Sequence, residues 1–153
     1  MNLSHFTLLK IDQNNKEHLS FLKQLFLDET VKKYLSGLNK YIGENDYILY
    51  NGNEKIGYVS LTKPLLNHFQ SITTTIYYAI DKKHRGNHYA QQLLLDLEEH
   101  LKDKIDQFVV QISRYNKASL AVASNAGFKI VFDDINDEMI VLNKEITNKK
   151  NRK

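Results

Sequence analysis

Cysteine and tryptophan are absent from this chain of 153 residues, and proline occurs once, at Pro64. Without a thiol the chain forms no disulfide, thiolate zinc site or iron–sulfur cluster, and it has no cysteine nucleophile. The lack of cysteine fits the reducing cytoplasm, which is the location we expect. No hydrophobic run approaches the roughly 18 residues of a membrane span, and residues 1–6 lack the features of a signal peptide. We therefore expect no membrane partner.

What is present is the composition of one folded domain. Hydrophobic residues make up 42% and charged residues 25% of the chain, which is the balance of a globular protein rather than a disordered one. The length corresponds to one ordinary domain. Because we find no internal repeat, low-complexity segment or linker, we expect a single domain over residues 1–142.

The positive charge is concentrated at the C-terminus. The chain has a net charge of +3, but residues 143–153 hold five basic residues and one acid, so the remainder carries −1. Binding of nucleic acid needs a basic face on the folded domain. We therefore expect no nucleic-acid partner and interpret 143–153 as a flexible basic tail.

Seven segments have the composition or the alternation of β-strands. The second and third are joined by Asn51-Gly52-Asn53, a strong signal for a tight hairpin turn. The fourth is rich in Thr, Ile and Tyr, which favour strands. The expected strands cover 6–11, 47–50, 55–61, 71–80, 108–112, 128–132 and 138–142.

Apolar residues recur at helical spacing in two parts of the chain, and cap residues mark a third expected helix. The first pattern, from Leu19 to Leu38, fits two short amphipathic helices or one helix broken near residues 28–30. The last has Asn116 in the N-cap position and Gly127 as its terminator. The expected helices cover 19–38, 90–101 and 118–126.

The order of these elements limits the fold. The strand–helix–strand unit over 71–112 implies a right-handed crossover and a parallel pair of strands, whereas the hairpin over 47–61 is antiparallel. The sequence therefore predicts an α/β (mixed α+β) fold, with a mixed, mainly antiparallel sheet of about seven strands and helices on both faces.

One loop of the chain has the chemistry of an anion site. The strand that ends at Ile80 is followed by a basic loop with Lys82, Lys83 and Arg85, and a helix begins near His88. Helix N-termini carry unpaired N–H groups and partial positive charge, so such a loop suits phosphate. The plainer alternative is a solvated basic turn. The loop is neither a P-loop nor a dinucleotide fingerprint, because the glycines that those motifs require are missing.

Two blocks of the sequence resemble the GNAT N-acetyltransferase superfamily. Residues 78–90, Tyr-Ala-Ile-Asp-Lys-Lys-His-Arg-Gly-Asn-His-Tyr-Ala, are similar to its acyl-CoA-binding segment, a strand, then Arg/Gln-x-x-Gly-x-Gly/Ala, then a helix. Residues 116–119, Asn-Lys-Ala-Ser, followed by 126–128, Ala-Gly-Phe, are similar to its second block. The order of elements over residues 6–142 also matches, so the family fold is expected here.

This resemblance implies that the parallel central strands splay apart and that the pantetheine of acetyl-CoA lies between them. Backbone groups of residues 78–80 would pair with the pantetheine amides, and N–H groups of residues 85–90 would hold the pyrophosphate. Asn116 would reach toward the cofactor, or would simply cap its helix. The implied cofactor residues are Tyr78, Ala79, Ile80, Lys83, Arg85, Gly86, Asn87, His88, Tyr89, Ala90, Asn116 and Ser119.

The sequence departs from the family pattern within the loop. Lys83 stands where Gln or Arg is usual, which keeps the charge but loses the planar guanidinium. His88 replaces the second glycine, and its Cβ would crowd a backbone that must approach phosphate closely.

The catalytic groups are less complete. The resemblance implies an oxyanion donor in the backbone N–H near Ile80, and Tyr78 is a candidate for proton chemistry. The glutamate that many relatives carry on this strand is missing, and the usual tyrosine donor is replaced by Ala123. Neighbouring candidates, each with an ordinary structural alternative, are Tyr77, Tyr78, Tyr115, Ser124 and His68. His84 and His88 have no evident third ligand, so we expect no metal.

The resemblance therefore implies an N-acetyltransferase that moves an acetyl group from acetyl-CoA to a primary amine in a ternary complex. The acceptor would be a small molecule or a peptide, bound between the helices at 16–38 and the loop at 62–70, in a monomer or homodimer. The alternative is a CoA-binding module with weak or no catalysis, which the missing tyrosine and glutamate favour. A nucleic-acid-binding domain is a third hypothesis, supported only by the basic tail.

Overall fold

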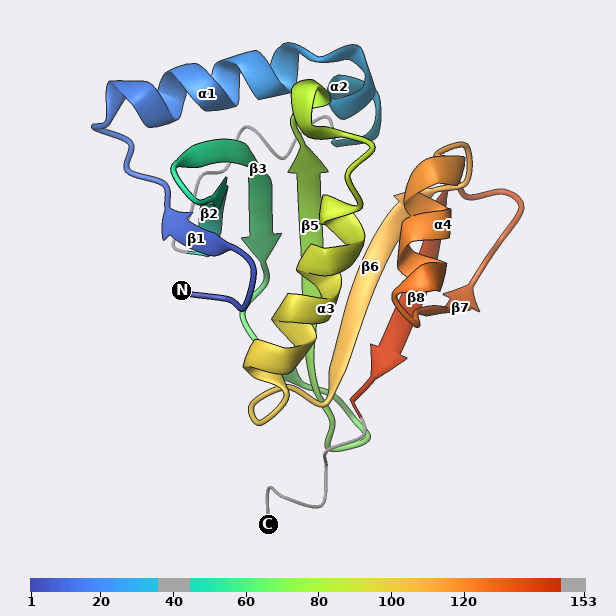
Figure 1. The fold of residues 1–153 in the computed structure, drawn as a ribbon. Helices are drawn as coiled ribbons and strands as arrows, with labels where there is room; N and C mark the ends of the chain where they lie inside the picture. The colour runs from blue at the N-terminus through green and yellow to red at the C-terminus, as the bar shows by residue number, and fades with distance from the viewer. Residues whose placement is uncertain (36–44, 147–153) are drawn as a thin grey trace.

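A computed structural model describes residues 1–35 and 45–146 of the chain. The order of strands and helices along the chain is close to the order that the sequence predicts (Figure 1). The elements are β1 (Thr7–Lys10), α1 (Lys16–Leu27), α2 (Glu29–Leu35), β2 (Asp46–Asn51), β3 (Glu54–Leu61), β4 (Leu65–Leu66), β5 (Ile72–Ile80), the 3₁₀ turn η2 (Lys82–His84), α3 (Tyr89–Leu101), β6 (Gln107–Ser113), α4 (Lys117–Asn125), β7 (Lys129–Phe132) and β8 (Met139–Glu145).

The strands form one open sheet in the order β1-β2-β3-β5-β6-β8-β7, with β4 paired to β5 beside this path. Among the described strands, β5 and β6 are parallel and the other neighbouring pairs are antiparallel. The predicted mixed, mainly antiparallel sheet is confirmed. The prediction of about seven strands missed β4, because a pair of exposed leucines after Pro64 carries no alternation that sequence reasoning can detect.

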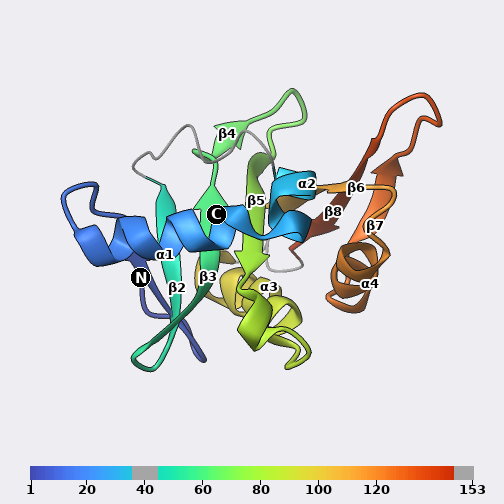
Figure 2. The same cartoon turned by 90° about the horizontal axis from the view of Figure 1, so that it is seen from above.

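Helices cover both faces of this sheet. Side chains alternate along each strand, so each strand contributes residues to a core on either face. On β3, Val59 belongs to the larger hydrophobic core beneath α3, whereas Tyr58 belongs to a smaller core beneath α1 and α2. Figure 2 shows α3 and α4 set apart from α1 and α2 when the molecule is seen from above. The prediction of helices on both faces is confirmed.

The apolar spacing identified the buried face of each helix. Leu22 and Leu25 of α1 are buried in the smaller core, and Leu93, Leu94 and Leu97 of α3 are buried in the larger one. The helical pattern from Leu19 is divided into α1 and α2, as the broken-helix prediction allowed. Its last predicted residues, 36–38, lie outside the described residues.

The junction between α1 and α2 is a single extended residue, Asp28 (φ −60°, ψ 127°). Its N–H donates to the Leu25 carbonyl at 3.2 Å, and its Oδ1 accepts from the N–H of Thr30 at 2.9 Å. The aspartate thus ends one helix and begins the next, which explains the break near residues 28–30.

Strand β8 continues to Glu145, three residues past the predicted end, since it stays paired with β6 as far as Gln107. Within this extension Lys144 Nζ donates to the Ala126 carbonyl at 2.6 Å and forms an ion pair with Glu98. Residues 143–145 of the predicted tail therefore belong to the sheet, and residues 147–153 lie outside the described residues. Within residues 1–35 and 45–146, no helix is both long and apolar enough to cross a membrane.

Candidate active site

The parallel strands β5 and β6 separate halfway along their length. Their Cα register covers only Thr73 to Thr75, opposite residues 107–109. Beyond that point β5 remains paired with β3 as far as Ile80, and β6 remains paired with β8 as far as Ser113. Each strand is held on its outer side only, so the sheet opens between them toward the end of β5.

A cavity of about 500 Å³ occupies this opening. Its lining residues come from β5 and β6, from α2 on one face of the sheet and from α3 and α4 on the other, so the cavity reaches both faces between the separated strands. The lining residues are Thr30, Val31, Ile76, Tyr77, Tyr78, Ala79, Ile80, His84, Arg85, Gly86, His88, Tyr89, Ala90, Val110, Gln111, Ile112, Ser113, Asn116, Ala118, Ser119 and Val122.

Backbone groups of β5 point into the opening. The N–H of Asp81 donates to the Ile56 carbonyl on β3 at 2.7 Å, and hydrogen bonding alternates along an antiparallel ladder. The N–H and C=O groups of Tyr78 and Ile80 therefore face away from β3, toward the separated β6. Consistently, the Ile80 carbonyl accepts from Arg85 Nε at 3.0 Å rather than from β3.

The loop between β5 and α3 presents a row of free N–H groups. The first backbone bond of the helix runs from Gln92 N–H to the His88 carbonyl at 3.0 Å. In the described part of the chain, the N–H groups from Gly86 to Gln91 have no hydrogen-bond acceptor. Free donors at a helix N-terminus form an anion site, and Gly86 supports this backbone with φ +85°.

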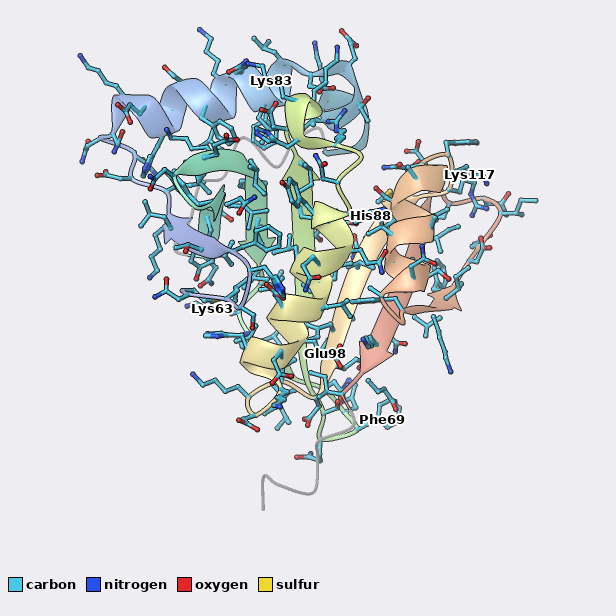
Figure 3. The ribbon with its side chains drawn as sticks, in the orientation of Figure 1. Lys63, Phe69, Lys83, His88, Glu98 and Lys117 are labelled. Atoms are coloured by element: carbon cyan, nitrogen blue, oxygen red, sulfur yellow. The ribbon has the colours of Figure 1, made fainter. Side chains whose placement is uncertain are left out.

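His88 shows how the chain replaces the second glycine of the family pattern. It adopts the left-handed conformation, with φ 60° and ψ 22°, directly before α3. Glycine favours this region and other residues seldom enter it, so the backbone path that glycine would take is kept. The side chain does not cap the helix, and it lines the cavity at the start of α3 (Figure 3).

Tyr78 places a buried hydroxyl in the cavity wall. The hydroxyl has no hydrogen-bond partner among the described residues, although the nearby Ser119 side chain acts to lower the pKa. Burial dominates and raises the pKa of Tyr78 to about 12. An unpaired buried hydroxyl costs about 1–3 kcal/mol, so this group is available to a polar atom that enters the cavity.

The charged side chains of the loop do not all face the cavity, as they would in a simple anion site. Arg85 lines the cavity, but its Nη2 lies 3.1 Å from Asp28 Oδ2. His84 Nε2 lies 2.7 Å from Glu54 Oε2. Lys83 does not line the cavity; it lies against a groove beside α1, near the top of Figure 3, and Asn87 also lies outside the lining.

The second sequence block reaches the same cavity from α4. Asn116 caps this helix, since its Oδ1 accepts from the Ser119 N–H at 3.3 Å, and both residues line the cavity. Tyr89 and Ala90 line it from α3, and the Tyr89 hydroxyl accepts from Asn51 Nδ2 at 3.2 Å. The structure thus brings together all predicted site residues except Lys83 and Asn87.

Some of the other proton-transfer candidates line the cavity and others lie away from it. Tyr77 lines the cavity, and burial raises its pKa, whereas Tyr115, Ser124 and His68 do not line it. Ala123 is fully buried in the larger core. Within the described residues, no group of three or more histidine or acidic side chains is placed to hold a metal ion.

The cavity lining differs from the acceptor pocket that the sequence predicts. Thr30 and Val31 of α2 line the cavity, but none of residues 62–70 does. Phe69 lies at the lower end of the molecule in Figure 3, far from His88. Gln111 and Ser113 complete this lining from β6. Sequence reasoning missed them because nothing in the sequence shows where β6 leaves its parallel neighbour.

Comparison with known families decides the identity of this fold. The family model described as acetyltransferase (GNAT) domain matches residues 7–129. The chain belongs to the GNAT acetyltransferase family. At the sequence level no curated protein gives a significant match.

Solved structures share the GNAT fold over nearly the whole chain. An aminoglycoside N(6')-acetyltransferase from Legionella pneumophila has a TM-score of 0.76 at 14% identity, covering 100% of this chain and 98% of its own. Spermidine N-acetyltransferase from Vibrio cholerae, in complex with CoA and spermine, has a TM-score of 0.73 at 15% identity, covering 94% and 97%. An acetyltransferase from Salmonella typhimurium that modifies the N-terminal serine of ribosomal protein L7/L12 has a TM-score of 0.72 at 20% identity. This match covers 94% of the present chain and 96% of the Salmonella chain.

Proposed function

We propose that this GNAT domain moves an acetyl group from acetyl-CoA to a primary amine, which attacks directly in a ternary complex. The observation that carries the proposal is the cavity through the split sheet, with the free N–H groups of residues 86–91 at its edge. An opening on both faces lets the acyl donor and the amine approach one another from opposite sides.

The residues around the cavity fit acetyl-CoA. The free N–H groups at the start of α3 suit a diphosphate, and the inward-facing backbone groups of Tyr78 suit an amide of pantetheine. The cofactor supplies an activated thioester. Asn116 and Ser119 complete the site from α4, so the proposal uses the residues that the sequence blocks identified.

The backbone N–H of Ile80 would stabilise negative charge on the acyl oxygen, since it is already oriented toward the cavity. The hydroxyl of Tyr78 is protonated at neutral pH, and burial raises its pKa to about 12, so it stays a hydrogen-bond donor well into the alkaline range. We propose that it donates a hydrogen bond to the departing sulfur, a role for which Ala123 offers no group.

The acceptor is proposed to be a small-molecule or peptide amine that enters from the α1–α2 face. Its wall combines the apolar Val31 with four uncharged polar side chains, Thr30, Tyr77, Gln111 and Ser113. Among the described lining residues there is no Asp or Glu, so the amine would lose its proton to water rather than to a carboxylate. The names of three structural neighbours, which refer to an aminoglycoside, spermidine and a protein N-terminus, support an amine in general.

Calorimetric titration of the chain with CoA, and release of free thiol from acetyl-CoA with a panel of amines, test this proposal. Gly86→Val should weaken CoA binding at least tenfold, about 1.4 kcal/mol, because a β-branched residue resists φ +85°. Gly52→Val is the matched control: Gly52 also has a positive φ (+61°), but it lies in the β2–β3 turn and does not line the cavity. Equal affinity of the two variants would contradict the placement of the diphosphate.

The second candidate function is a CoA-binding module with weak or no catalysis. The observation in its favour is that neither the usual tyrosine nor a carboxylate is present in the described cavity wall. Tight CoA binding without thiol release on any amine would favour the module, and thiol release that depends on the amine would favour the enzyme.

A further inference from the structure

Arg85 was expected to bind phosphate, yet its side chain points to the junction of α1 and α2. Its Nη2 lies 3.1 Å from Asp28 Oδ2, and its Nε donates to the Ile80 carbonyl at 3.0 Å. Asp28 Oδ2 has no hydrogen-bond partner among the described residues. The contact with Asp28 is therefore an ion pair rather than an aligned hydrogen bond.

Asp28 links the Arg85 guanidinium to the first turn of α2. Its side chain is only 12% exposed, which limits the screening of the ion pair by solvent. Its other oxygen, Oδ1, accepts from the N–H of Thr30. Thr30 and Val31 follow directly and line the cavity on the acceptor side.

Arg85 thus connects three segments around the cavity. It bonds to the end of β5 at Ile80, it directly precedes Gly86, which has the first of the free N–H groups, and it pairs with Asp28, which directly precedes α2. These segments are far apart in the sequence, and no other ion pair in the described residues joins the β5–α3 loop to the α1–α2 junction.

We propose that Arg85 is a positioning residue that acts through Asp28, holding the diphosphate-binding loop and the acceptor wall of α2 in a fixed relation. The proposal builds on the function proposed above. The carboxylate beside the guanidinium makes the pair nearly neutral and weakens its attraction for phosphate, so the cofactor relies on the N–H groups that Arg85 keeps in place. Loss of Asp28 alone then harms both halves of the site.

Variants of the two partners separate this role from direct phosphate binding. Positioning predicts that Asp28→Asn weakens CoA binding at least threefold, and that Asp28→Asn with Arg85→Gln is no weaker than Arg85→Gln alone. Direct phosphate binding predicts the reverse: Asp28→Asn frees the guanidinium and leaves CoA binding equal to or tighter than wild type. With an amine substrate, positioning raises KM for acetyl-CoA and for the amine, whereas direct binding raises KM for acetyl-CoA only.

Amide hydrogen exchange of the ligand-free chain gives a readout that does not depend on the proposed function. Asp28→Asn should accelerate exchange both at Gln92, whose N–H donates to the His88 carbonyl at 3.0 Å, and at Lys32, whose N–H donates to the Asp28 carbonyl at 2.8 Å. Glu54→Gln is the control, because it breaks the ion pair of His84 in the same loop without touching Arg85, and it should leave Lys32 unchanged. Unchanged exchange in Asp28→Asn overturns the positioning role, even if wild type binds CoA. Wild type that fails to bind CoA refutes the proposed function instead.

Discussion

Gly57 of β3 lies against the carbonyl of Ala79 on β5 so closely that a Cβ at position 57 would stand 2.4 Å from the carbonyl oxygen. The contact joins the two strands beside the last residues of β5, where Tyr78 and Ile80 direct their backbone groups into the cavity. Glycine at this position therefore allows β3 to support the wall of the active site.

Replacing this glycine should displace the end of β5. Gly57→Ala requires a backbone shift, and overpacking of this kind costs about 1–3 kcal/mol of unfolding free energy. Urea unfolding measures the stability, and CoA titration measures the damage to the site. A variant with wild-type stability and affinity would show that the strands adjust freely at this contact.

The left-handed conformation of His88 predicts a specific tolerance to substitution. His88→Asn should be close to neutral, because asparagine tolerates this region. His88→Val should lose about 1–2 kcal/mol, since a left-handed conformation is costly for other residues. Thermal unfolding of the two variants compares them directly. Similar losses in both would mean that the imidazole ring, rather than the backbone conformation, is what matters at this position.

Burial of Tyr78 predicts a loss of stability at alkaline pH. The pKa rises from 10.0 to about 12 on folding, so the folded chain keeps a proton that the unfolded chain releases. The contribution is complete below pH 10 and falls by about 1.4 kcal/mol per pH unit as pH rises toward 12.

Other buried tyrosines also have raised pKa values, Tyr47, Tyr58 and Tyr77 among them, so the wild-type curve alone does not isolate Tyr78. Tyr78→Phe should flatten the decline between about pH 10 and pH 12, measured as unfolding free energy relative to wild type. Parallel curves for the two proteins would contradict the burial of this hydroxyl.

Asn116 has two roles that substitution can separate. Asn116→Ala removes the N-cap of α4 and should cost about 1 kcal/mol, whereas Asn116→Ser keeps a capping oxygen and should restore the stability. If the amide also contacts the cofactor, as the family resemblance implies, serine will restore stability without restoring CoA affinity. Recovery of both properties would leave Asn116 as a cap alone.

The local patterns of the chain were sufficient for most of the fold. The spacing of Leu93, Leu94 and Leu97 identified the buried face of α3, the Asn51-Gly52 turn identified the β2–β3 hairpin, and two short blocks identified the GNAT family. These features depend on neighbouring residues along the chain, through helical or strand periodicity and turn conformation. They can therefore be recognised from the sequence without a structure.

The arrangement of the site depended on contacts between distant segments. Nothing near Arg85 in the sequence indicates Asp28 as its partner, or shows that Lys83 faces another groove. The point where β5 and β6 separate likewise follows from pairing with β3 and β8. A side chain's partner is selected by packing and by competition among all the charges that folding brings near it, and that competition exists only in the assembled structure.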